Sequence, residues 1–297
     1  MLRYLLSASF TIFSIAIISA QDFQGMAVYE SKTSTGQFSS SLSGNKEITP
    51  DMQKMIEERM KKMFEKTFIL YFDKTASLYE EEEKLDAPGS EGAARGSRMM
   101  AAFTGGGGKH YKNLKTKSFR IEKEMMGKEF LVKDSLPKLA WKMTGESKQI
   151  GSYTCFKATA TQATAKTDFR NFVPKPNSDA KKETAEKEKP KATNFFNQGD
   201  MPTEIEVTAW YTPDIPVGHG PENFYGLPGL ILEVTAGKTT MLCSKVVLNP
   251  KDRKEIKEPT KGKEVTQTEF DEIVMKKMEE MQQMYQNRGG NPIKIGG

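Results

Sequence analysis

Short runs in which apolar and polar residues alternate recur along this chain, and they restrict its fold more than any other feature. In TEIEVTAWYT, for example, Ile205, Val207 and Ala209 alternate with polar residues. Such runs are typical of strands with one buried face. They do not alternate with helices in a βαβ rhythm. The pattern therefore predicts an α+β, β-dominated protein built on a curved antiparallel sheet.

Two segments have helical periodicity instead. In the first, Thr49 is a suitable N-cap, Pro50 suits the first helical position, and apolar residues follow at spacings of three and four. The second, TQTEFDEIVMKKMEEMQQMYQN, has Thr268 near its start and a pair of glycines past its end. We expect one helix after the first strand, which is predicted at Gly25–Ser34, and another at the C-terminus.

Two hairpins are predicted within the sheet. The first turns at Asp73-Lys74 and returns through Leu78 and Tyr79. The second turns near Gly237, between two runs of apolar and β-branched residues.

Two stretches have a composition that does not suit a packed core. Residues 80–109 contain a run of acids and later four glycines, and residues 166–200 are rich in Lys, Glu, Ala and Pro. Such segments cannot bury enough apolar surface to offset the entropy lost on ordering. We therefore expect a single domain over residues 21–297, with flexible insertions at about 80–109 and 166–200.

The chain begins with the three-part pattern of a secretory signal peptide. Arg3 precedes an apolar run over residues 5–18, and small residues follow up to Ala20. The run is shorter than the roughly 20 residues that span a bilayer. We predict cleavage after Ala20, which leaves an exported protein, periplasmic or secreted, without a transmembrane segment.

The charge balance does not suggest a nucleic-acid partner. The chain has 44 Lys and Arg against 39 Asp and Glu, a formal net charge of +5, and the signs are mixed along its length. Nucleic-acid binding needs basic residues that cluster on one face. We therefore expect no nucleic acid among its partners.

Cys155 and Cys243 are the two cysteines of the chain. In an oxidising compartment an isolated pair favours a disulfide, which would contribute roughly 4 kcal/mol for a loop this long. Two buried free thiols that pack in the core are the alternative. Neither cysteine belongs to a CxxC motif, so neither a zinc site nor a thioredoxin-type redox site is indicated.

Methionine is unusually frequent, with 17 residues. A methionine stripe at a strict spacing of three lies in the C-terminal helix and consists of Met275, Met278, Met281 and Met284. Thioethers are soft ligands suited to Cu(I), and successive sulfurs at this spacing lie near one another. The alternative is that these side chains pack as flexible core material. Soft-metal binding is therefore an alternative function, and we expect no other cofactor.

The sequence contains no recognisable catalytic constellation. Its two histidines, His110 and His219, form no HxxH or HExxH motif, and GxSxG does not occur. GGGGKH lacks the first glycine and the final Ser or Thr of a phosphate-binding loop. His219 lies between glycines, where it can act as a ligand or general base or cap nearby backbone groups. An uncharacterised hydrolase is thus only a second alternative, and we expect a protein that is not an enzyme.

The stretch GPENFYGLPGLILEV leads into a buried strand. Pro228-Gly229 predicts a type II turn in which the glycine has a positive φ. Leu230, Leu232 and Val234 are then expected on one face of the strand, with Ile231 and Glu233 on the other.

This stretch also resembles the signature of the GLPGLI family, exported envelope proteins of Bacteroidota with no agreed activity. The signature residues are Gly226, Leu227, Pro228, Gly229, Leu230 and Ile231. A preceding segment, AWYTPDIPVGHGPENFY, is similar to the family as well. So is an earlier strand, which carries Trp141, Lys148, Gly151, Tyr153, Cys155 and Ala158. The resemblance covers most of the chain outside the insertions; it implies an exported protein and no catalytic residue.

Together these features favour a non-catalytic binding or carrier protein of the periplasm. A curved, helix-covered sheet would be half-barrel-like and similar to lipoprotein-carrier folds. A concave face of that kind suits an apolar ligand or another envelope protein as partner.

Overall fold

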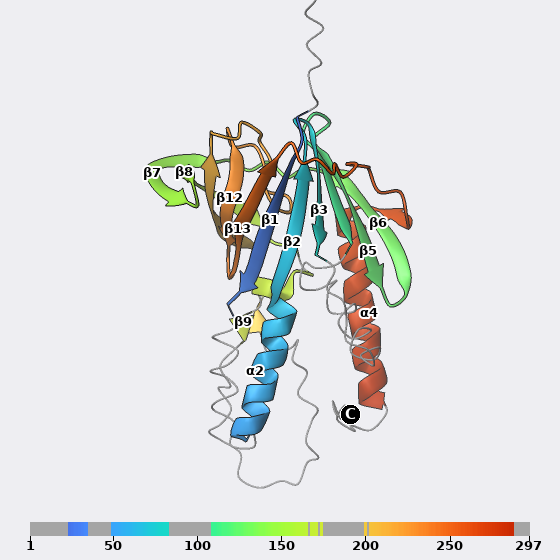
Figure 1. Ribbon diagram of the computed structural model, residues 1–297. Coiled ribbons are helices and arrows are strands. Elements are labelled where there is room, and N and C mark those ends of the chain that lie inside the picture. The colour runs from blue at the N-terminus through green and yellow to red at the C-terminus, as the bar shows by residue number, and fades with distance from the viewer. Residues whose placement is uncertain are drawn as a thin grey trace, which may run out of the picture.

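The computed structural model describes residues 23–34, 49–82, 108–165, 167–171, 173–174, 199–200 and 202–287. Its main element is one open, curved sheet of 12 strands (Figure 1). The strands of this sheet are β1 (Gly25–Thr33), β2 (Glu65–Phe72), β3 (Ala76–Glu81), β4 (Lys109–Asn113), β5 (Ser118–Met125), β6 (Lys128–Ser135), β7 (Lys142–Ile150), β8 (Tyr153–Ala163), β11 (Glu204–Thr212), β12 (Leu230–Ala236), β13 (Thr239–Leu248) and β14 (Lys263–Val265). The predicted β-dominated α+β fold is confirmed.

The strand order divides the sheet into two arms on either side of β1. The full order is β14-β6-β5-β4-β3-β2-β1-β13-β12-β11-β8-β7. Neighbouring strands pair antiparallel, except that β14 pairs parallel with β6. The sheet is therefore mixed at one edge, where the chain returns from the second arm to the first.

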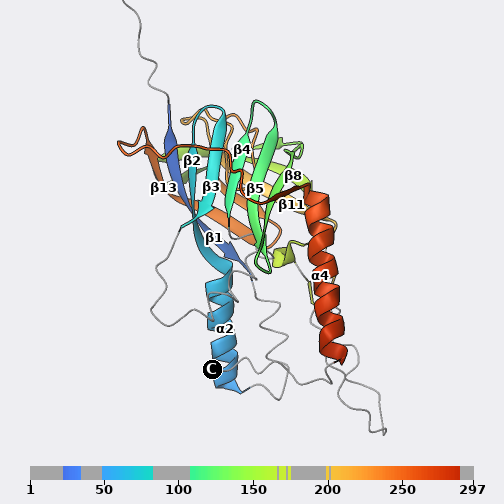
Figure 2. The same ribbon diagram turned by 90° about the vertical axis from the view of Figure 1, so that its right-hand side faces the viewer.

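Two helices accompany the sheet, as predicted. In α2 (Pro50–Phe64), Thr49 is the N-cap and its hydroxyl accepts a hydrogen bond from the amide of Met52 at 3.3 Å. The helix runs directly into β2 and projects beyond the end of the sheet (Figures 1 and 2), so it does not cover the concave face in the way the sequence suggested. No helix within the described ranges combines the length and apolarity needed to cross a membrane.

The C-terminal helix α4 (Gln267–Asn287) packs against the arm that contains β5 and β6 (Figure 2). Its N-terminus is a capping box. Thr266 accepts a hydrogen bond from the Glu269 amide at 3.2 Å, and the Glu269 carboxylate accepts one from the Thr266 amide at 2.7 Å. Phe270 and Val274 of this helix are fully buried against the first arm.

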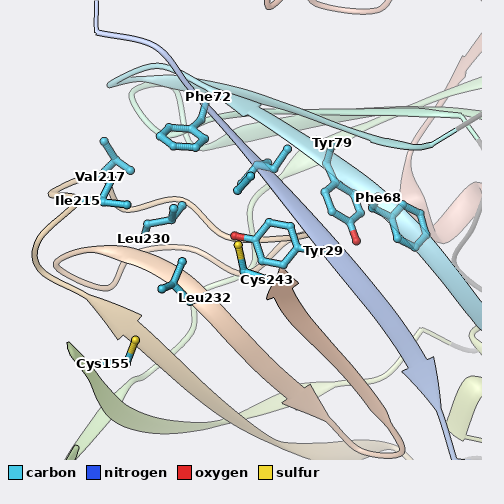
Figure 3. Packing of buried hydrophobic residues seen from close by; sticks show 12 residues of the cluster. Tyr29, Phe68, Phe72, Tyr79, Cys155, Ile215, Val217, Leu230, Leu232 and Cys243 are labelled. Carbon is cyan, nitrogen blue, oxygen red and sulfur yellow. The ribbon is translucent and has the colours of Figure 1, made fainter. Parts of the chain in front are cut away.

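A central core cluster joins the two arms (Figure 3). It contains Ala27, Tyr29, Phe68, Leu70, Phe72, Tyr79, Cys155, Ile215, Val217, Leu230, Leu232 and Cys243. The Tyr29 hydroxyl donates to the Ile231 carbonyl at 2.7 Å, which satisfies a polar atom inside an otherwise apolar cluster. The predicted hairpins at Asp73 and Gly237 are both present, between β2 and β3 and between β12 and β13.

The strand after the GLPGLI motif departs from simple alternation. Leu230 and Leu232 lie in the central cluster, but Val234 lies in a second cluster together with Ile231. The reason is a bulge, because Trp210 pairs with Glu233 whereas Tyr211 pairs with Ile231, which leaves Leu232 as an extra residue. The prediction that Leu230, Leu232 and Val234 share one face is therefore wrong from the bulge onward.

The predicted type II turn at Pro228-Gly229 is also wrong. Gly229 does not have a positive φ, whereas Gly226 has a φ of 90°. Gly229 is needed for a different reason, since a Cβ atom there would lie 2.0 Å from the Thr212 carbonyl oxygen. In this motif Gly226 is needed for its positive φ, and Gly229 is needed because the backbone of Thr212 lies so close to it.

Most of the two predicted insertions falls outside the described residues, at 83–107 and 175–198. Within the second insertion, the 3-10 helix η1 (Phe169–Asn171) and the two-stranded ladder of β9 (Val173–Pro174) and β10 (Gly199–Asp200) are described.

Candidate ligand-binding cavity

A cavity with a volume of about 410 Å³, called here the concave cavity, lies inside the curve of the sheet. Ile121 of β5 forms part of one wall, and Gln162 of β8 and Ile205 of β11 form part of the opposite wall. Since β5 and β8 lie in different arms, the curvature of the sheet is what encloses this space. The volume falls within the range of roughly 300–1,000 Å³ that is usual for small-molecule sites.

The loop between β11 and β12, residues 213–229, crosses the inside of the sheet and is called here the signature loop. Lys112 of β4 fastens it, because its ammonium group donates to the carbonyls of Gly220 at 2.8 Å, Glu222 at 2.8 Å and Phe224 at 3.0 Å. These bonds use all three donors of the ammonium group. In the sheet, β3, β2, β1 and β13 lie between β4 and β12, so the contact spans the two arms.

The buried position of Lys112 affects its protonation. The side chain is 1% exposed, and burial lowers the pKa of Lys112 to about 7, although Glu222 acts in the opposite direction. Trp141 gives the signature loop a second attachment by donating from its indole nitrogen to the Tyr225 carbonyl at 2.8 Å. The tip of the loop is thus held from both sides and forms part of the cavity wall through Glu222, Asn223 and Phe224.

A partly buried ion cluster lies in the wall near this tip. Arg170 of η1 donates to both carboxylate oxygens of Asp168 at 2.8 Å, and to those of Glu222 at 2.6 and 3.2 Å. Burial alone would lower the pKa of Arg170, but Glu222 and Asp168 outweigh it and raise the pKa. Paired carboxylates on both sides of a guanidinium give the charge a fixed geometry. Arg170 therefore holds the signature loop against η1.

The N-terminal turn of α4 contributes another polar group. The Asp271 carboxylate accepts hydrogen bonds from the Thr167 hydroxyl at 2.7 Å and from the side-chain amide nitrogen of Gln267 at 2.8 Å. Opposite it, the Lys123 ammonium lies 4.9 Å from the centre of the Phe270 ring. Burial lowers the pKa of Lys123, and Asp271 opposes this. The helix thereby contributes Gln267 and Asp271 to one side of the cavity.

Two polar atoms in the wall have no partner. The Gln162 side-chain oxygen and the Thr164 hydroxyl are buried, and neither has a hydrogen-bond partner among the described residues. Buried polar atoms are normally paired, so these two atoms of lining residues are exceptions, and a donor that reached them would satisfy them. His110, by contrast, is bonded to Asn223 at 2.8 Å, and burial lowers the pKa of His110 to about 3. His110 is therefore neutral at neutral pH.

His219 does not occupy the position expected of a ligand or base. Its side chain is fully buried beside Phe72 and does not line the concave cavity. Burial lowers the pKa of His219 to about 3; Lys112 adds to this, and the backbone of Asp73 opposes it. Neither ring nitrogen has a hydrogen-bond partner of normal geometry within the described residues.

The cysteines and the methionine stripe lie away from the cavity wall. Cys155 and Cys243 are separate buried thiols in the central cluster, with no disulfide between them, and burial raises the pKa of each thiol to about 11. In the methionine stripe, Met278 packs against the cluster around Phe270, whereas Met275 is 38% and Met284 61% exposed. This divergence follows from a spacing of three, which drifts around a helix of 3.6 residues per turn.

Sequence reasoning missed the residues that build the cavity. Asp168 and Arg170 fall within a segment that was predicted to be a flexible insertion, and Lys112 is one of many lysines in polar strands. The run TDFRN contains an aromatic residue between an acid and a base, which differs from the Lys/Glu/Ala composition that follows. That local difference was the one available signal.

The fold and the cavity together describe an α+β protein in which one curved sheet surrounds a partly charged cavity. Comparison with known families then gives a narrower relation. Residues 141–233, about a third of the chain, match a family model described as a protein of unknown function (Porph_ging). The matched range includes the GLPGLI motif and the strand that carries Cys155.

Other comparisons give only distant relations. No curated protein matches the chain. Among solved structures, that of PNGF-II in the C2 space group is 14% identical, with a TM-score of 0.45, and the match covers 86% of this chain and 33% of that one. The P21 form is 13% identical with a TM-score of 0.41, covering 82% of this chain and 31% of that one. This chain therefore spans about a third of the length of the PNGF-II chains.

Proposed function

We propose that this protein is a non-catalytic binding protein of the cell envelope that holds a small amphipathic molecule in the concave cavity. The observation that carries the proposal is the cavity of about 410 Å³, whose wall combines aromatic rings with buried polar atoms that have no partner among the described residues. Mostly apolar walls with a few convergent polar groups are typical of ligand sites.

The lining favours an amphipathic ligand over the purely apolar one expected from the sequence. Phe68, Phe119 and Phe224 supply apolar surface, but the wall also contains seven acidic or basic side chains. An apolar ligand alone would displace water from these groups without replacing its hydrogen bonds, which is unfavourable.

The same geometry supports a binding role over catalysis. Asp168 and Glu222 are both engaged by Arg170, and His110 is neutral and bonded to Asn223. A general base or acid needs a pKa near the working pH and access to a substrate atom. Neither carboxylate nor His110 combines a pKa near the working pH with access to a substrate atom. These three side chains therefore give little support to a hydrolytic activity.

Native mass spectrometry on residues 21–297, exported into a periplasm and purified gently, tests the proposal. We expect a co-purified small molecule, and we expect Ile121→Trp to remove it, because Ile121 lines the cavity and the larger ring would fill it. Leu242→Trp is the matched control, since Leu242 is 41% exposed and does not line the cavity. A bound mass that survives Ile121→Trp, or no bound mass in any variant, would contradict the proposal.

A further inference from the structure

We infer that the ligand of the concave cavity is an organic cation with N–H donors, an alkylammonium group on a short aliphatic chain. This inference rests on the proposed binding role and assigns the chemical class of the ligand. Three independent features of the wall support it: its net charge, the vacancy of its hydrogen-bond acceptors, and its aromatic surface.

The wall has an excess of negative charge. Its acidic residues are Glu80, Asp134, Asp168, Glu222 and Asp271, and its basic residues are Lys123 and Arg170. His110 adds no charge, since its pKa is about 3. Among the described lining residues, negative charges therefore outnumber positive ones by three. Two lysines outside the lining reduce this excess: Lys254 pairs with Glu80, and Lys112 lies beside Glu222. An excess of one sign on a concave wall favours ligands of the opposite sign.

Both cations of the wall already have favourable neighbours. Arg170 uses its guanidinium on Asp168 and Glu222, and Lys123 lies over the Phe270 ring at 4.9 Å with Asp271 in attractive range. A bound anion would have to compete with these carboxylates for either group. Each cation in the described part of the wall thus already has a carboxylate nearby, which disfavours anionic ligands.

The vacant atoms of the wall are acceptors. The Gln162 side-chain oxygen can only accept hydrogen bonds, and the Thr164 hydroxyl can accept two in addition to donating one. Both atoms are buried, and no described residue donates to them. An ammonium group supplies three donors and no acceptor, so it complements these atoms as well as the negative potential.

Aromatic rings complete the match. Phe68 and Tyr79 are stacked with ring centres 4.8 Å apart, and both line the cavity together with Phe119. Ring faces attract cations, and they also bury methylene groups. An alkylammonium ion can therefore place its charged end near the acceptors and its chain along the rings. A free diamine and the side chain of a lysine residue in a peptide share this chemistry.

Isothermal titration calorimetry with four probes tests the inference on residues 21–297. The probes are 1,5-diaminopentane, N-acetyl-lysine methylamide, neutral 1,5-pentanediol and the dianion pentanedioate. We expect the two ammonium probes to bind at least tenfold more tightly than the diol and the dianion. If the lysine derivative binds more tightly than the diamine, the natural source is a peptide; the reverse order indicates a free amine.

Variants assign the binding to the cavity. Gln162→Leu should weaken ammonium binding at least tenfold, which corresponds to about 1.4 kcal/mol, without unfolding the protein, because the Gln162 oxygen has no partner to lose. The matched control is Thr161→Leu, one residue earlier on β8 and exposed. Equal weakening in both variants, or none in Gln162→Leu, would overturn the assignment.

The result also separates this inference from the proposed function. If pentanedioate or pentanediol binds best, and Ile121→Trp abolishes that binding, the binding role stands and the cationic class is wrong. If no probe binds and native mass spectrometry finds no ligand, the proposed function fails together with the inference.

Discussion

Replacing Lys112 with Met tests whether one ammonium group holds the signature loop in place. The substitution keeps most of the aliphatic length of the side chain but removes the donors to the carbonyls of Gly220, Glu222 and Phe224. Hydrogen bonds to a charged group contribute roughly 1.5–3 kcal/mol each. Against this, burial of an ammonium group costs several kcal/mol, which the variant recovers. We expect a net loss of about 3 kcal/mol in the free energy of unfolding.

Urea denaturation followed by tryptophan fluorescence is the assay. Trp141 is a useful reporter because its indole nitrogen donates to Tyr225 in the signature loop. We expect a lower urea midpoint with an unchanged m-value, since the surface exposed on unfolding stays the same. At roughly 2–4 °C per kcal/mol for a domain of this size, the melting temperature should fall by about 6–12 °C.

Lys109→Met is the control variant for this experiment. Lys109 lies on the same strand, but its side chain is exposed, so the free energy of unfolding of Lys109→Met should stay within about 0.5 kcal/mol of the wild type. If Lys112→Met is as stable as the wild type, the three bonds do not hold the loop. Packing of the buried Phe224 and Leu227 would then be sufficient to fix it.

Three other predictions follow from buried or clustered side chains. Because the pKa of His219 is about 3 in the folded protein and 6.5 unfolded, stability should decrease as pH falls between these values. His219→Phe should therefore lose about 2 kcal/mol less than the wild type between pH 6.5 and 4.5, measured by urea midpoints; equal losses would contradict this. Both thiols have a pKa of about 11, so the native protein should react slowly with a thiol reagent at pH 8 and rapidly in urea. A mass two hydrogens light and no reaction even in urea would instead support the predicted disulfide. For the methionine stripe, changing all four residues to Leu should abolish Cu(I) uptake, measured by native mass spectrometry, if the soft-metal alternative holds; unchanged uptake would remove it.

The sequence predicts those elements of the fold whose capping or turn residues lie within a few positions of the element itself. Thr49 and Pro50 mark the start of α2 in the chain itself, and Asp73 marks the turn between β2 and β3. The return of β14 to pair with β6, in contrast, depends on a contact across more than a hundred residues. The three residues of β14, Lys263–Val265, show no pattern that would indicate β6 as the strand with which β14 pairs.

The candidate cavity could not be predicted for a related physical reason. Arg170 and Lys112 look like ordinary surface residues in sequence, since burial of a charge depends on carbonyls or carboxylates that distant segments bring to it. The bulge at Leu232 is similar, because the alternation of β12 predicts one face and only its pairing with β11 shows where that face changes. What the sequence did predict correctly is that the GLPGLI motif leads into a buried strand.

The central position of β1 has a consequence for the order in which the protein assembles. One neighbour, β2, is the next described strand along the chain, but the other is β13, and Gly25 pairs with Leu248. A chain emerging N-terminus first therefore has one edge of β1 unpaired until β13 becomes available. Unpaired edges are sites of intermolecular strand addition, and such distant pairings form slowly because a long loop must close first. The first strand of the described sheet is thus among the last to be completed, and during that interval the nascent sheet is most open to pairing with another chain.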